Sequence, residues 1–142
     1  MKKALSIIII SVLICSLVAC NFNNSRENVT TDSILELFSN DYSSQKYTSE
    51  IISDIITNIE NSGISLNGNI TTVVHLTKKE SQPDASDWSW AYVYEFTDEA
   101  DAIAFEENRR TFVEATEENG MCIRCGLIVV FGSAPIISSM EN

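Results

Sequence analysis

The chain has 142 residues, enough for one domain with a modest hydrophobic core. It carries 20 acidic and 9 basic residues and a formal net charge of −11 at pH 7. A surface this acidic repels phosphate backbones and anionic lipid, so nucleic acid is not an expected partner.

The first segment has the pattern of an export signal. Lys2 and Lys3 precede an almost unbroken apolar run, Leu5–Val18. This run is shorter than the roughly 20 apolar residues that a membrane-spanning helix needs. It closes with Leu17-Val18-Ala19-Cys20, an ending that is similar to the lipobox of bacterial lipoproteins. The resemblance covers residues 1–20 only.

The lipobox resemblance implies cleavage before Cys20, a diacylglyceryl group on its sulfur, and a domain held at the extracytoplasmic face of the cell membrane. Residues 1–19 are then the signal peptide, and residues 20–31 are the lipidated cysteine and a polar tether. Cleavage removes two lysines and leaves 7 basic against 20 acidic residues, a formal charge of −13. The signal resembles those of low-GC Gram-positive bacteria; in a Gram-negative source, Asn21 resembles the outer-membrane sorting pattern. The alternative is an uncleaved N-terminal anchor in which Cys20 is incidental.

Residues 32–142 are predicted to form one α+β domain, which begins with two helices and a strand. Ser33 and Glu36 have capping-box spacing, which predicts a short first helix. Isoleucines at positions 51, 52, 55, 56 and 59 follow the spacing of one helical face, and Gly63 stands where a C-terminal cap is expected. The alternation over Ile70–Thr77 predicts a strand.

A polar loop, Lys78–Asp87, leads into a second predicted strand over Trp88–Phe96. Thr97 or Asp98 then caps a helix with an acidic first turn, which suits the helix dipole. Carboxylates at helical spacing are typical of a solvated face. The residues interpreted in this way are Asp98, Glu99, Asp101, Glu106 and Glu107.

The last part of the chain is predicted to add a third strand, Cys122–Phe131, and a short helix that begins at Pro135. With the two N-terminal helices counted as one helical segment, the order is α-β-β-α-β-α, which favours a small two-layer sandwich. We expect a three-stranded, mainly antiparallel sheet in the order 2-1-3, with its helices on one face.

The second strand carries a row of aromatic residues that share parity and therefore face one side of the sheet. The simplest interpretation is a core face beneath the following helix. Five large rings are many for a short domain, however, so the end next to the loop is a candidate ligand platform for a sugar ring or a peptide side chain. Trp88, Trp90 and Tyr92 form this platform; we expect Trp88 and Trp90 to be partly exposed, and Tyr94 and Phe96 to be buried.

Cys122 and Cys125 are a candidate disulfide, because exported compartments permit such bonds. Residues three apart on a regular strand face opposite sides, so a bond requires a turn or bulge. Unpaired thiols, redox work and a metal site are the other interpretations, in falling order. A zinc site needs more ligands than these two cysteines and His75 supply, and His75 is interpreted as structural or exposed. We predict no catalytic residue, no metal site and no cofactor.

The sequence therefore favours a non-enzymatic, membrane-anchored binding or interaction module. Its expected partners are membrane lipid, through acylated Cys20, and a cationic peptide or a cell-wall component. The acidic charge of the chain favours a cationic ligand. Two alternatives stay open. One is a thiol–disulfide redox protein that uses Cys122 and Cys125, and the other is a self-protection lipoprotein that binds a cationic peptide.

Overall fold

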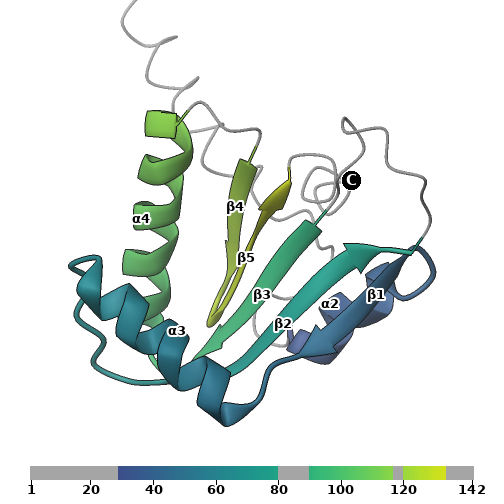
Figure 1. Cartoon of the computed structure of the whole chain (residues 1–142), viewed down its shortest axis with the longest axis horizontal. Coiled ribbons are helices and arrows are strands. Elements are labelled where there is room, and N and C mark those ends of the chain that lie inside the picture. The colour runs from purple at the N-terminus through teal and green to yellow at the C-terminus, as the bar shows by residue number, and fades with distance from the viewer. Residues whose placement is uncertain (1–28, 80–89, 117–119, 134–142) are drawn as a thin grey trace, which may run out of the picture.

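The computed structural model describes residues 29–79, 90–116 and 120–133. These residues form three helices and five strands (Figure 1). In chain order they are α2 (Thr31–Phe38), β1 (Tyr42–Lys46), α3 (Ser49–Asn61), β2 (Ile70–Lys78), β3 (Trp90–Phe96), α4 (Glu99–Thr116), β4 (Gly120–Cys125) and β5 (Ile128–Ser133). The predicted features outside the described residues are the signal peptide, the lipidated Cys20 with most of the tether, most of the Lys78–Asp87 loop, Trp88, and the helix expected from Pro135.

The strands form one antiparallel sheet in the order β1-β2-β3-β5-β4. The α+β class is confirmed, but the predicted three-stranded sheet in the order 2-1-3 is wrong. β2 and β3 are antiparallel neighbours as expected, with Val74 opposite Val93. The segment predicted as the third strand pairs with β3 instead of β2, through Val130 opposite Val93.

The predicted third strand, Cys122–Phe131, is in fact a hairpin of β4 and β5. Cys125 lies opposite Ile128, so only Gly126 and Leu127 form the turn. Gly126 has a φ of +61°, which glycine adopts without steric cost and which two-residue hairpin turns require. The sequence pattern did not indicate this turn, because the residues on both sides of Gly126 are apolar.

β1 is not predicted by the sequence, because its pattern is polar. Four of its five residues are exposed, and it pairs on one side only, with β2. Short polar edge strands of this kind resist edge-to-edge aggregation, since they offer little apolar surface to a second sheet.

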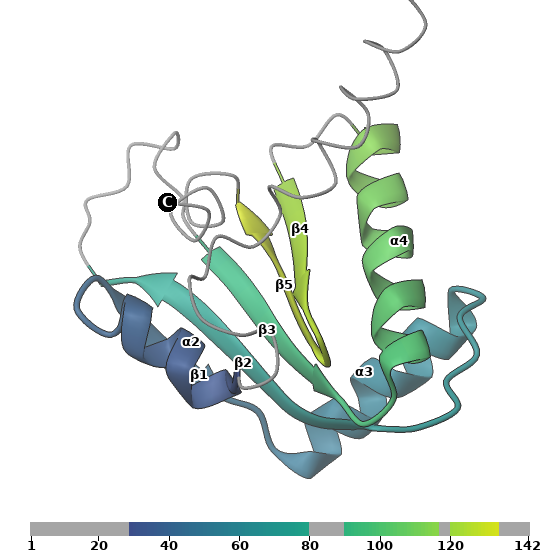
Figure 2. The same cartoon turned by 180° about the vertical axis from the view of Figure 1, so that it is seen from behind.

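The helices cover both faces of the sheet, so the prediction of helices on one face is wrong. α2 packs Ile34 and Phe38 on one face, against Val74 of β2 and its neighbours. α3 and α4 pack on the other face, through side chains such as Ile59 and Phe105. Figure 2, seen from behind, shows α2 in front of the sheet and α3 behind it. The domain therefore has three layers, with the sheet in the middle.

The start of α2 also differs from prediction. Thr30 is the N-cap, and its side chain and that of Ser33 form a reciprocal capping box. The tether predicted to end at residue 31 therefore reaches into the domain, because Thr31 is already helical and buried. None of the helices in the described ranges is long and apolar enough to cross a membrane.

The strongly periodic segments agree with prediction. α3 is a helix over the isoleucine-rich segment, and Gly63 follows it with a φ of +94°. Ile52 and Ile59 are buried, whereas Ile51 is 41% exposed at the edge of the helical face. The backbone N–H of Asp101 donates to the Asp98 side chain, so Asp98 caps α4 as expected.

Candidate functional site

The aromatic row of β3 lies on the face that α3 and α4 partly cover. Trp90, Tyr92, Tyr94 and Phe96 all contact the core on this side, which confirms their predicted common face. Phe96 is 1% exposed and Trp90 is partly exposed, as expected. Tyr94, predicted to be buried, is only partly buried. The row is therefore core at its Phe96 end and partly exposed toward Trp90.

Rings from α4 and β5 continue this row. Phe105 lies 4.7 Å from the ring centre of Tyr94 and 5.4 Å from that of Phe96. Trp90 meets Phe131 of β5 at 5.6 Å, with the ring planes at 72°. Edge-to-face contacts at such distances are favourable because the positive edge of one ring meets the negative face of another.

His75 and Tyr47 extend the row onto the neighbouring elements. The imidazole of His75 stacks on Tyr92 at 4.5 Å, with the planes only 11° apart. Tyr47, between β1 and α3, lies 6.2 Å from Tyr92. Partial burial and a hydrogen bond with Tyr92 raise the pKa of Tyr47. We call the four partly exposed residues Tyr47, His75, Trp90 and Tyr92 the aromatic face.

His75 gives the folded chain a measurable pH dependence. Partial burial lowers the pKa of His75 from its ordinary value of 6.5. Folding favours the neutral ring, because the pKa of His75 is lower in the folded than in the unfolded chain. The contribution of His75 to the free energy of unfolding is therefore fully present above pH 6.5 and declines as the pH falls from 6.5 toward the folded-state pKa. The chain has one histidine, so its imidazole NMR signals report the titration directly. We expect a folded-state midpoint below 6.5; a midpoint at or above that value would contradict the partial burial of His75.

A cation lies beside the aromatic face. The guanidinium carbon of Arg109 on α4 lies 5.3, 5.5 and 5.8 Å from the ring centres of Phe105, Phe112 and Phe131. Burial raises the pKa of Tyr94, and the charge of Arg109 opposes this rise. Phe131 also contacts Trp90, so Arg109 is separated from the aromatic face by one ring.

The two cysteines do not form a disulfide with each other. β4 is regular at this point, so Cys122 faces α4 while Cys125 lies on the opposite side of the strand. Burial and the nearby Glu106 raise the pKa of the Cys122 thiol to about 12. Thiol exchange requires a thiolate, so this environment disfavours redox work at Cys122.

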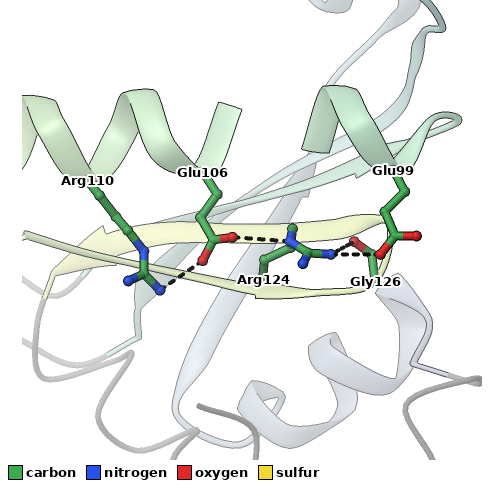
Figure 3. A network of polar contacts seen from close by, with 5 residues as sticks. All are labelled: Glu99, Glu106, Arg110, Arg124 and Gly126. Carbon is green, nitrogen blue, oxygen red and sulfur yellow. Dashed lines mark hydrogen bonds and ion pairs between the residues drawn. The ribbon is translucent and has the colours of Figure 1, made fainter. Parts of the chain in front are cut away.

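The acidic residues of α4 do more than form a solvated face. Figure 3 shows Arg124 of β4 between two of them, with distances of 3.1 Å to Glu99 and 3.1 Å to Glu106. The same guanidinium donates to the carbonyl oxygen of Gly126 at 3.0 Å. Arg110 pairs with Glu106 at 2.8 Å on the helix surface. This network ties α4 to the β4–β5 hairpin. Asp101, also expected to be solvated, is 1% exposed and accepts hydrogen bonds from the loop before β2.

A concave region of about 430 Å³ lies between α2 and β1. Its lining includes the carboxylates of Asp32 and Glu36, the ring of Tyr42 and the amine of Lys79. Lys79 donates to the carbonyl oxygen of Ser39 at 2.5 Å. The charges in this hollow are of both signs, so it selects no charged ligand.

Sequence reasoning did not identify Tyr47 or Arg109 as site residues. Tyr47 meets Tyr92 only because β1 folds back beside β2, and the sequence does not predict β1. Arg109 had a local signal. Phe105, Arg109 and Phe112 follow the i, i+4, i+7 spacing of one helical face, which places the arginine among the rings.

The comparisons with known proteins do not assign a function to this site. No family model, no curated protein and no solved structure matches the chain. In the described part of the chain, no three His, Cys, Asp or Glu side chains gather as metal ligands.

Proposed function

We propose that the mature chain is a non-enzymatic binding module, anchored by lipid on the extracytoplasmic side of the membrane, and that its aromatic face binds sugar rings of a cell-wall glycan. The observation that carries the proposal is the parallel stack of His75 on Tyr92, with the rings of Trp90 and Tyr47 beside it, all partly exposed.

The chemistry of these four side chains supports a polyhydroxylated ligand. Each combines a flat apolar ring with a polar group: two phenol hydroxyls, one imidazole and one indole N–H. Such side chains can cover a sugar ring and bond to its hydroxyl groups at the same time. A hydrocarbon ligand would favour aliphatic walls without donors and acceptors.

The membrane anchor rests on the Leu-Val-Ala-Cys ending at Cys20. Replacing Cys20 by serine should leave an unprocessed precursor, because the sulfur that carries the diacylglyceryl group is lost. Intact-mass analysis of the membrane fraction should show diacylglycerol on the wild-type chain. An unmodified Cys20 in processed protein would overturn this part of the proposal.

Binding at the aromatic face is tested with the full-length chain in detergent micelles. In calorimetric titrations with a neutral N-acetylglucosamine oligomer, Tyr92→Ala should weaken binding about tenfold, the scale of one lost ring contact. Leu37→Ala is the control, because Leu37 is 55% exposed on α2 at the other face of the sheet. Equal affinities for wild type and Tyr92→Ala would refute binding at this face.

A cationic peptide is the competing ligand, favoured by the formal charge of −13 after cleavage. The same titration with a short lysine-rich peptide distinguishes a glycan ligand from a cationic peptide ligand. Binding of the peptide together with no binding of the sugar would replace the glycan proposal with the self-protection alternative.

A further inference from the structure

Arg109 differs from its neighbours in how its charge is satisfied. Arg110 and Arg124 each pair with at least one carboxylate of α4. Arg109 makes no ion pair within the described part of the chain, and its Nη2 donates to the side-chain oxygen of Asn108 at 2.7 Å. Its Nε is buried and has no hydrogen-bond partner among the described residues.

The surrounding rings stabilise this cation only in part. Phe105, Phe112 and Phe131 offer their faces to the charge, and such contacts are favourable. A ring face does not replace a hydrogen-bond acceptor for a buried N–H, however, and an unsatisfied buried donor calls for an explanation. Nε itself is closed to solvent, but the arginine as a whole is partly exposed and Phe112 beside it is 42% exposed, so a ligand can approach the side chain.

The position of Arg109 links it to the aromatic face. Phe131 contacts both Arg109 and Trp90, so one ring separates the guanidinium from the aromatic face, and a ligand that covers Trp90 and extends past this ring can reach it. An anionic group is the natural partner, because arginine binds carboxylates through a planar, charge-assisted fork.

The overall charge limits what kind of anion can bind. An acidic chain repels polyanions, such as acidic peptides and phosphate polymers, over distances comparable to the Debye length. A ligand with a single carboxylate on an otherwise neutral sugar avoids most of this repulsion and still pairs with Arg109.

We propose that Arg109 is a specificity-determining residue that selects a sugar bearing one carboxylate, while the aromatic face binds the adjacent neutral ring. This inference rests on the proposed glycan binding and names the chemical class of its ligand.

The test compares two probes, one with and one without the negative charge: the disaccharide of N-acetylglucosamine and N-acetylmuramic acid, and its carboxyl methyl ester. The full-length wild type should bind the free acid about tenfold more tightly than the ester, as expected for one charge-assisted contact. Arg109→Gln should remove this preference, so that the variant binds the acid and the ester with equal affinity.

Arg110→Gln is the matched control. It changes the net charge equally, one residue along α4, but Arg110 already pairs with Glu106 and its side chain is 54% exposed. The control should keep the preference for the free acid. Loss of the preference in both variants would mean that only long-range charge matters, and the assignment to Arg109 would fall.

The wild-type measurement keeps the inference testable even if Arg109→Gln does not fold. Equal wild-type affinity for acid and ester would overturn the role of Arg109, while Tyr92→Ala would still test glycan binding through the ester. Binding of neither probe would refute the proposed function itself, so the two failures are distinguishable.

Discussion

Replacing Phe96 by alanine is expected to lower the free energy of unfolding by about 3–5 kcal/mol. Phe96 is 1% exposed at the end of β3, and its ring lies 5.4 Å from that of Phe105 on α4. It belongs to the core cluster that also holds Val73 and Ala102. Truncation removes the buried ring and leaves a cavity between the sheet and α4. Urea unfolding followed by circular dichroism measures the change.

The matched control for Phe96→Ala is Phe112→Ala. Phe112 is 42% exposed on α4, so its truncation opens no cavity. The expected loss is below about 1 kcal/mol, chiefly from its contact with the Arg109 guanidinium. If both variants lost the same stability, the inner end of the aromatic row would not be core.

The elements predicted correctly are those with strong local periodicity. The isoleucine spacing of α3, the alternation of β2 and the aromatic parity of β3 each reflect the period of a single element whose side chains pack on the core. These signals are local, so they survive without knowledge of the neighbouring strands.

The errors arise where the pairing of distant strands decides the structure. β1 has no apolar alternation and is held by β2, as in the pairing of Ser44 with Leu76. The β4–β5 hairpin looks like one strand because apolar residues flank Gly126 on both sides. The wrong sheet order followed from these two errors. Because β1 occupies the free edge of β2, the last segment of the chain pairs with β3 instead.

The candidate site was predicted only as far as one strand could show it. Parity placed Trp90 and Tyr92 on one face, but their partners come from other elements. His75 lies opposite Tyr92 only in the observed register of β2 and β3. This register also explains why His75 stacks on the ring of Tyr92.

Replacing Asp101 by alanine should destabilise the domain by about 1.5–3 kcal/mol, because the loop before β2 loses its charge-assisted hydrogen bonds to this buried carboxylate. Asp101 lies in the first turn of α4 and is 1% exposed. Its carboxyl oxygens accept from the Asn67 N–H at 2.9 Å and from the Gly68 N–H at 2.7 Å. The Asn67 side chain adds a third bond at 3.3 Å. Within the described ranges, all hydrogen bonds between this loop and α4 go to Asp101.

The Asp101 prediction can be separated from a general charge effect. Glu107→Ala on the same helix removes one carboxylate that is exposed, and it should change the unfolding free energy by less than about 0.5 kcal/mol. Asp101→Asn should fall between the two, because the amide keeps one acceptor oxygen and replaces the other with a donor. Hydrogen exchange at the Gly68 amide should quicken in Asp101→Ala and not in Glu107→Ala. An amide that loses its acceptor exchanges more readily with solvent. Unchanged exchange at Gly68 in Asp101→Ala would therefore show that the carboxyl group does not hold the loop against α4.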